Sequence, residues 1–374
     1  MKYTYIFLLT IAVITFSCKS DHTGNNSDFG EILKEVYEQN PDVVGIMARI
    51  EAPEKNITWS GVAGLADKND TVQIFPDQPA LVTSNTKTFM AAAFLRLVEQ
   101  GKISLESPVD TLLTKKTSKL LNDAGYDLGK IRVKNLLTNT SGISDFVKTK
   151  TYEEKVKSEP NHRWTRDEQI KLMIDEGGSP VEPESSFKYS DANYLLLSEI
   201  LENSTGKNFY EAIREQVNYS KNGLNSTWFY TLEDPPKDLK PLIHQYMNTS
   251  ESYIQDPSFD LYGAGGLAST TKDLGRFTQL FFTGALFDKP ETKDLIFTEV
   301  KTKDGIESNY YLGVGKINLN GNIGYGHSGF WGTYAYYFPE LNASIVVFVS
   351  NHNRVDLVPV IMEKLLNGVI NYEL

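Results

Sequence analysis

Ser84 and Lys87 are the residues of this chain whose types and spacing best fit covalent chemistry. Residues three apart on a helix share a face, so the hydroxyl and the amine can reach each other. A serine hydroxyl becomes a nucleophile when a neighbouring base takes its proton. A lysine can be that base only if its surroundings lower its pKa from about 10.4. The structural alternative is a helix-capping serine beside a solvated lysine.

The apolar segment behind this pair sets it apart from two other Ser-x-x-Lys pairs, Ser204–Lys207 and Ser269–Lys272. Residues 89–95 are apolar on nearly every side, which is typical of a buried helix. A lysine at the start of a buried helix is hard to solvate, and this favours a chemical role for Lys87. The N-terminus of the helix also offers free backbone N–H groups to a developing oxyanion.

Tyr189 and Asp191 come just before a second predicted helix, residues 195–203. The tyrosine hydroxyl could relay a proton in a hydrolytic reaction. Aspartate is also an ordinary N-cap residue, so Asp191 could be purely structural. Taken alone, the segment favours a structural interpretation.

His327 lies in the segment Gly-Tyr-Gly-His-Ser-Gly, residues 324–329, which formally matches G-x-G-x-x-G. A dinucleotide-binding loop requires a helix after this motif, whereas residues 330–338 predict a strand, so we reject that function. The glycines instead indicate a strand edge where a ligand approaches the backbone. A buried and satisfied histidine is the alternative for His327 alone.

Composition narrows the function further. The 374 residues are 40% hydrophobic and 23% charged, which predicts a folded chain of one large or two domains. Lys and Arg number 37 against 48 Asp and Glu, so the net charge of −11 argues against nucleic-acid binding. The scattered histidines form no zinc motif, and there is no phosphate-binding loop and no G-x-S-x-G elbow. We expect no metal and no cofactor.

The N-terminal residues predict export. Lys2 and the apolar residues 6–16 are typical of a signal peptide, and the apolar run is shorter than the about 20 residues of a spanning helix. Residues 17–18 resemble a bacterial lipobox, so we expect a signal peptide at 1–17 and a lipid anchor on Cys18. Residues 18–28 then form a polar tether on the periplasmic or cell-envelope face. An ordinary secretory signal with an incidental cysteine is the alternative.

Strands are expected near both ends of the chain, with helices between them. We therefore predict a sheet part at about residues 29–80 and 240–374, split by a helical part at about residues 81–239. The expected elements are a helix at 29–39, a hairpin of 43–50 with 57–62, helices at 83–100 and within 104–232, strands at 330–338 and 344–350, and a helix at 355–366.

Five segments, taken in order, resemble the β-lactamase-like serine hydrolases, which comprise class C β-lactamases, D-alanyl-D-alanine carboxypeptidases and related esterases. They are residues 82–93, 98–105, 136–143 (with Asn139 where histidine is common), 265–274 and 327–329. The likeness runs from about residue 45 to residue 351. It implies an α/β fold of the β-lactamase/transpeptidase type, an antiparallel sheet flanked by helices with an inserted helical domain.

The resemblance also implies a mechanism. Ser84 would attack a carbonyl and form an acyl-enzyme, and Lys87 and Tyr189 would share the proton transfers, with either of them as the base. The backbone N–H groups of Ser84 and Phe330 would form the oxyanion hole. The residues expected to align the substrate are Asp191, His327, Ser328 and Gly329.

Asp191 departs from the family pattern, which usually has asparagine at this position. Aspartate can accept a hydrogen bond from Lys87 but cannot donate one to a substrate carbonyl unless it is protonated. A Lys87–Asp191 pair would keep the lysine charged, which favours Tyr189 as the base. The substitution argues against a β-lactam or an acyl-D-Ala substrate more strongly than it argues against hydrolysis.

The sequence therefore predicts an exported serine hydrolase that acts on a small-molecule or peptide-like amide or ester, carboxypeptidase-like or esterase-like. The alternatives are a β-lactamase and a catalytically inactive surface binding protein of the same fold. A membrane contact through the lipid anchor is the other expected partner.

Overall fold

The computed structural model describes residues 27–248 and 250–373. Cys18, the predicted signal peptide and most of the predicted tether lie outside the described residues. Helix α1 (Ser27–Gln39) already begins at Ser27, so the last two residues of the predicted 18–28 tether are helical. None of the helices in residues 27–248 and 250–373 has the length and apolar character needed to cross a membrane.

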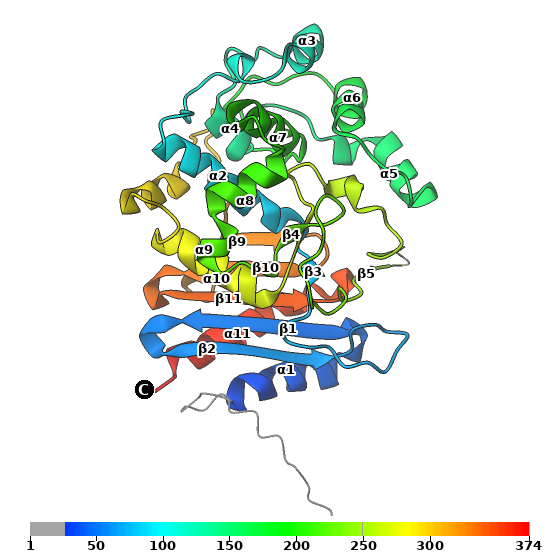
Figure 1. The fold of residues 1–374 in the computed structure, drawn as a ribbon, viewed down its shortest axis with the longest axis vertical. Coiled ribbons are helices and arrows are strands. Elements are labelled where there is room, and N and C mark those ends of the chain that lie inside the picture. Colours follow the sequence, from blue (N-terminus) through cyan, green and yellow to red (C-terminus); the bar gives the residue numbers. More distant parts are fainter. Residues whose placement is uncertain (1–26, 249, 374) are drawn as a thin grey trace, which may run out of the picture.

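A six-stranded antiparallel sheet carries the fold, in the strand order β2-β1-β11-β10-β9-β8. Its strands are β1 (Gly45–Ala52), β2 (Ile57–Gly64), β8 (Gly315–Leu319), β9 (Asn322–Gly329), β10 (Thr333–Phe338) and β11 (Ala343–Val349). Strands from both ends of the chain thus share one sheet, and the predicted hairpin of β1 and β2 forms one side of it (Figure 1).

Helices cover both faces of this sheet. Helices α1 and α11 (Leu357–Ile370) pack side by side on one face, where a core cluster includes Leu33, Ile345 and Leu365. Helix α10 (Thr271–Thr283) lies on the other face, against β1, β10 and β11. The observed architecture matches the predicted class of antiparallel sheet flanked by helices.

Most of the remaining helices form a second layer above the sheet in Figure 1, and the last of them lies beside α10. They are α2 (Thr86–Glu99), α3 (Lys115–Asp123), α4 (Val133–Leu137), α5 (Lys150–Ser158), α6 (Arg166–Glu176), α7 (Ala192–Thr205), α8 (Phe209–Val217) and α9 (Tyr219–Asn222). Helix α2 runs through the middle of the molecule, and residues 89–95 have no exposed surface. This confirms that α2 is buried on every side.

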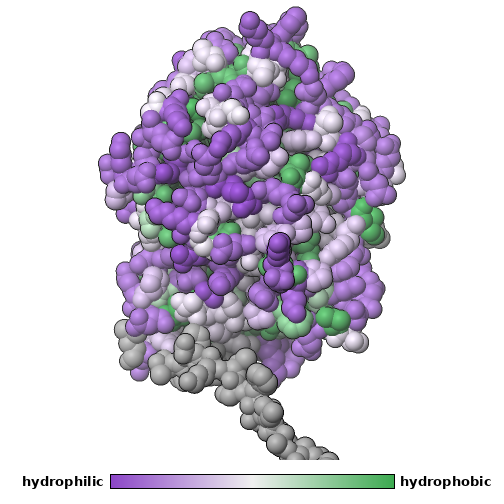
Figure 2. All heavy atoms as spheres, viewed as in Figure 1, coloured by the Kyte–Doolittle hydropathy of each residue, from purple (hydrophilic) through white to green (hydrophobic). Residues whose placement is uncertain are grey.

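Short strands and turns join the two layers. The short strands are β3 (Ala80–Leu81), β4 (Trp228–Phe229), β5 (Tyr246–Met247), β6 (Ser250–Glu251) and β7 (Leu267–Ser269). Strand β3 leads directly into the 3-10 turn η3 (Thr83–Asn85), which precedes α2. The face of the molecule in Figure 2 is mostly hydrophilic, with apolar side chains in small scattered groups.

One predicted strand begins later than expected. Residues 330–332 form the turn between β9 and β10, so the strand starts at Thr333 and not at Phe330. Gly332 has a φ of +89°, a left-handed conformation that ends an extended run and suits glycine. Phe330 is therefore a turn residue at the end of β9.

Candidate active site

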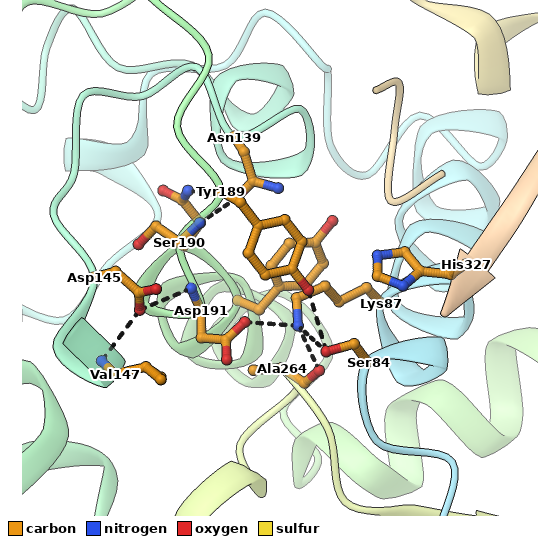
Figure 3. A network of polar contacts seen from close by, with 12 residues as sticks. Ser84, Lys87, Asn139, Asp145, Val147, Tyr189, Ser190, Asp191, Ala264 and His327 are labelled. Carbon is orange, nitrogen blue, oxygen red and sulfur yellow. Dashed lines mark hydrogen bonds and ion pairs between the residues drawn. The ribbon is translucent and has the colours of Figure 1, made fainter. Parts of the chain in front are cut away.

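Ser84 and Lys87 meet where η3 passes into α2. The Lys87 side chain is fully buried, and its Nζ donates to Ser84 Oγ at 3.0 Å. The same nitrogen donates to the backbone carbonyl of Ala264 at 2.7 Å and lies 2.8 Å from Asp191 Oδ1 (Figure 3). Ser84 keeps partial exposure while its neighbours Thr83 and Asn85 are buried, so its hydroxyl is accessible.

Tyr189 approaches the serine from the loop before α7. Its hydroxyl donates to Ser84 Oγ at 3.1 Å, and its ring lies 5.0 Å from Lys87 Nζ. The structure thus brings Ser84, Lys87, Tyr189 and Asp191 together from two distant segments, as Figure 3 shows.

The two capping alternatives do not hold. Asn85 is the N-cap of α2 and makes no side-chain capping bond, so Ser84 is not a capping serine and Lys87 is not solvated. Asp191 occupies the N-cap position of α7, but its side chain accepts no capping bond. Its carboxylate contacts Lys87 instead.

The charges around Lys87 keep it an ammonium. Burial by itself lowers the pKa of Lys87, but the negative charge of Asp191 opposes this effect and the net pKa is raised. Burial raises the pKa of Tyr189, and the positive charge of Lys87 offsets this only in part. At neutral pH the site therefore holds a charged lysine and a neutral phenol.

The loop that carries Tyr189 and Asp191 is fixed by two side chains from the α4–α5 region. Asn139 Oδ1 accepts from the backbone N–H of Ser190 at 3.2 Å, and Asp145 Oδ1 accepts from the N–H of Asp191 at 3.2 Å. Asn139 has a φ of +57°, which asparagine tolerates better than most residues. Asn139, the residue that departs from the resembled segment, therefore has a structural role.

Two further buried carboxyl groups, those of Asp145 and Asp260, lie near the Lys87–Asp191 ion pair and were not predicted from the sequence. Burial raises the pKa of Asp145 to about 7, and the charge of Asp191 adds to the effect. Burial raises the pKa of Asp260 to about 8, again with Asp191 as the second cause. Each is a single acidic residue in a mixed segment, so no sequence pattern distinguished it.

His327 is held in one neutral form. Its Nδ1 lies 2.8 Å from the carbonyl of Ser328, which can only accept, so Nδ1 carries the proton. Nε2 then accepts from the Tyr310 hydroxyl at 3.0 Å. Burial, together with the charge of Lys87, lowers the pKa of His327 to about 3. Both ring nitrogens thus contact protein atoms, and Tyr310 is a site residue that the sequence did not reveal.

The end of β9 presents an open strand edge beside Ser84. Residues 327–329 pair with β10, whereas the pairing with β8 stops at Gly326. At two of the glycines the close approach is made by the protein's own backbone, and the approach of a ligand to this edge stays a prediction. A Cβ on Gly326 would lie 1.9 Å from the Ala335 carbonyl, and one on Gly329 would lie 2.3 Å from the Val82 carbonyl. These glycines allow close packing of the protein's own backbone.

That packing places the end of β9 against the turn that carries Ser84. A Cβ on Gly329 would also lie 2.4 Å from Thr83 Oγ1. Phe330 follows Gly329 directly, so the segments that supply the predicted oxyanion N–H groups, from Ser84 and Phe330, adjoin each other. Within residues 27–248 and 250–373, no cluster of three or more metal-ligating side chains is found.

Comparison with known proteins agrees with this geometry. The family model described as Beta-lactamase matches residues 43–360. The teichoic acid D-alanine hydrolase of Staphylococcus aureus (strain NCTC 8325 / PS 47) is 27% identical over 268 residues, covering 70% of this chain and 60% of that protein. Penicillin-binding protein 4* of Bacillus subtilis (strain 168) is 25% identical over 272 residues, covering 68% of this chain and 56% of that protein.

The chain thus matches little more than half the length of these curated relatives. Among solved structures, the D-amino acid amidase from Ochrobactrum anthropi SV3 superposes with a TM-score of 0.75 at 20% identity, covering 92% of this chain and 99% of that chain. Since the family match extends over most of the sequence and the fold agrees, this protein belongs to the beta-lactamase family.

Proposed function

We propose that this protein is a serine hydrolase that cleaves amide or ester bonds through an acyl-enzyme on Ser84. The observation that carries the proposal is the pair of hydrogen bonds that Ser84 Oγ receives, from Lys87 Nζ at 3.0 Å and Tyr189 OH at 3.1 Å. A partly exposed serine with two proton-handling groups in contact is the arrangement of an activated nucleophile.

Tyr189 is the proton relay in this proposal, because Asp191 keeps Lys87 charged. In acylation, Ser84 passes its proton to the Tyr189 oxygen in the same step in which the Tyr189 hydroxyl proton moves to the departing amine or alcohol, so the phenol stays neutral. In deacylation, water attacks the acyl carbon and passes a proton to the Tyr189 oxygen as the Tyr189 hydroxyl proton moves to the departing Ser84 oxygen, which frees the acid. The Lys87 ammonium stays in place and stabilises the negative charge that develops on the serine oxygen.

The substrate carbonyl takes its place between η3 and the end of β9. Its oxygen accepts from the N–H groups of Ser84 and Phe330, a type of contact worth about 10²–10³ in rate for each donor. The open edge at 327–329 aligns an extended acyl donor by backbone hydrogen bonds. His327 contributes its backbone only, since both its ring nitrogens are in use.

The charge of the site is compatible with an acyl donor that has a free ammonium group. Lys87 is neutralised by Asp191 and His327 is neutral, while burial keeps Asp260 mostly protonated and Asp145 partly protonated at neutral pH. The exposed Lys148, whose Nζ lies 3.5 Å from the Tyr189 carbonyl, is a further cation beside the loop. The site is therefore close to neutral, which is compatible with a D-aminoacyl amide or ester.

The names of two similar proteins support the same class. One is a D-amino acid amidase and another a teichoic acid D-alanine hydrolase, and both names specify D-amino acid derivatives. A β-lactamase is the second candidate, supported by the family match alone. A binding protein without turnover is the third.

A matched set of probes tests the proposal. We expect the purified protein to hydrolyse D-alanine p-nitroanilide or a D-alanyl p-nitrophenyl ester faster than the N-acetylated counterpart, which lacks the ammonium. Faster turnover of the N-acetylated compound would reject the ammonium preference. Retained fluorescent penicillin with no hydrolysis of the other probes would favour a penicillin-binding protein, and the absence of any adduct or turnover would reject the enzyme.

We also propose export and lipid attachment at Cys18, from the apolar residues 6–16 and the polar residues behind the cysteine. Multiple acyl chains hold a protein firmly at a membrane, whereas one chain holds it marginally. In a bacterial host that processes lipoproteins, the protein should partition into detergent, and Cys18→Ala should release it. Recovery of the wild-type protein wholly in the aqueous phase would contradict the anchor.

A further inference from the structure

Asp260 ends the turn η6 (Pro257–Asp260), immediately before the loop whose Ala264 carbonyl accepts from Lys87. Only 8% of the Asp260 surface is exposed. Its carboxylate folds back onto this loop, since a Cβ built on Gly265 would lie 2.1 Å from Asp260 Oδ2 and 2.5 Å from the Asp260 carbonyl. Asp260 therefore packs against the residue that follows Ala264 and limits where that carbonyl can lie.

A cavity of about 10 Å³ lies beside Asp260, and Thr83 and Trp331 also line it. Each of these three residues has a buried side-chain atom without a hydrogen-bond partner in the described part of the chain. The atoms are Asp260 Oδ1, Thr83 Oγ1 and Trp331 Nε1. It is unusual that three residues lining one small cavity each hold such an atom, because buried polar groups are nearly always paired.

The size and the chemistry of the cavity select one occupant. A volume of about 10–15 Å³ accommodates one water molecule, and buried waters make about three hydrogen bonds. The indole N–H can only donate, a carboxyl group accepts and when protonated also donates, and a threonine hydroxyl does both. Water satisfies all three, whereas a metal ion or an ammonium group would leave the indole N–H without an acceptor.

Thr83 gives this cavity a connection to the nucleophile. It directly precedes Ser84 and has a φ of +42°, a strained conformation for a β-branched residue. Thr83 lines the same cavity as Asp260, so its unpartnered hydroxyl could help to hold the turn in that conformation.

We propose that Asp260 is a positioning residue for the Ser84–Lys87 pair, and that one ordered water joins its carboxyl group to Thr83 and Trp331. This inference rests on the proposed hydrolase function. Through Gly265, Asp260 holds the Ala264 carbonyl that anchors Lys87. Through the water, it holds the turn that carries Ser84.

The water can be observed directly. A crystal structure of the wild-type protein at a resolution that shows solvent should place one water within hydrogen-bond distance of Asp260 Oδ1 and the Thr83 hydroxyl. A cavity without an ordered water, or a direct bond from Asp260 Oδ1 to another protein atom, would overturn the proposal.

Acylation kinetics test the coupling between the two residues. We expect Asp260→Ala and Thr83→Val each to slow acylation of Ser84 about tenfold, and the double variant to be no slower than the slower single variant. Thr83→Ser, which keeps the hydroxyl, should restore the rate. Additive losses, or an equal loss in Thr83→Ser, would overturn the bridge. The control is Asp256→Asn, which removes the capping carboxylate of the same turn and should leave the rate unchanged.

The pH profile separates positioning from simple support of the fold. Asp191, Asp145, Lys87 and Tyr152 are the titratable groups that interact with Asp260. Ionisation of Asp260 adds negative charge beside the developing oxyanion, so wild-type kcat/KM should decline above about pH 8. Asp260→Asn, which folds with the same shape, should move this decline to higher pH, and an unchanged profile would overturn the role.

The same experiments distinguish failure of this inference from failure of the proposed function. A wild-type protein that shows no acylation at Ser84 would reject the hydrolase itself. A wild-type protein that is acylated at the same rate as Asp260→Ala would leave the hydrolase standing and reject the positioning role.

Discussion

Two Ser-x-x-Lys pairs of this chain lie at the starts of helices, and in only one of these two pairs is the lysine buried against its serine. At the start of α2, Lys87 is buried and contacts Ser84. At the start of α10, Lys272 is exposed, and Ser269 shares a hydrogen bond with Thr227 at 2.8 Å. The spacing is identical, so it does not decide the function.

The helix ends differ as well. Helix α10 has an ordinary N-cap, in which the Thr270 side chain accepts from the Asp273 N–H. The N-cap of α2, Asn85, makes no such bond, and its amide donates to the Thr333 carbonyl and hydroxyl instead. The α2 end therefore gives up a stabilising cap of about 1 kcal/mol, and its N–H groups are not taken by a side chain. The comparison shows that the two pairs differ in the burial of the lysine and in its contact with the serine, and not in their spacing.

Replacing the two serines should give the largest contrast. Ser84→Ala removes the nucleophile and should lower ester hydrolysis by about 10⁴-fold or more. Ser269→Ala removes a hydroxyl that bonds to Thr227 and to the Thr270 carbonyl and does not contact Lys272, so it should keep the wild-type rate. The measurement is the steady-state hydrolysis of a p-nitrophenyl ester by both variants. Equal activity of the two variants would break the comparison.

Replacing the two lysines should affect both activity and stability. Lys87→Met leaves Asp191 without its ionic partner, so it should abolish measurable hydrolysis and lower the free energy of unfolding by about 3 kcal/mol. Lys272→Met changes an exposed side chain and should stay within about 0.5 kcal/mol of wild type. Urea unfolding measures both. Adding Asp191→Asn to Lys87→Met should restore part of the stability, and no recovery would argue against the ion pair.

Asp191→Asn should sharpen the electrostatic part of the comparison. The substitution removes the negative charge that raises the pKa of Lys87, so the alkaline limb of kcat/KM should move to lower pH. The amide also regains a donor for a substrate carbonyl, so activity on amides should improve relative to esters. Parallel pH profiles on one amide and one ester measure both effects. An invariant profile and ratio would mean that Asp191 has no electrostatic role.

The smallest expected effect concerns stability around Asp145. Because the folded pKa of Asp145, about 7, lies above the unfolded value of about 3.9, the folded state binds the proton more tightly. The associated stability is fully present below about pH 4 and is lost as the pH rises towards 7. Asp145→Asn should flatten this dependence of Tm on pH. If the Tm of the wild-type protein and the Tm of Asp145→Asn rose by the same amount between pH 4 and 7, the assignment would be contradicted.

The sequence was sufficient to predict the residues in contact with the serine. Lys87 and Tyr189 are residue types that can transfer protons, and they lie in motifs that follow one another in a recognisable order. The apolar residues 89–95 predicted that the helix, and with it Lys87, is buried. The layered fold was equally accessible, because helical and strand periodicities alternate clearly along the chain. The roles of these residues in turnover remain predictions.

Other site features carry no local pattern. The Ala264 carbonyl is a backbone atom that any residue could supply, and Tyr310 and Asp260 reach the site only through the folded topology. The turn at 330–332 was missed because its aromatic residues have high strand propensity, and the single Gly332 decides the outcome. The features that could not be predicted depend on how segments distant in the sequence come together in the fold, and not on residue type.

The most direct test of the account is the identity of the residue that becomes acylated. Wild-type protein is treated with an active D-alanyl ester and the reaction is quenched in acid. The intact mass of the protein is then measured, and the protein is digested for peptide mapping. We predict a single acyl adduct on the peptide that contains Ser84, and its loss in Ser84→Ala. An adduct on the peptide of Ser269 or Ser204, or an undiminished adduct in Ser84→Ala, would contradict the central claim that the buried Lys87 environment selects the nucleophile.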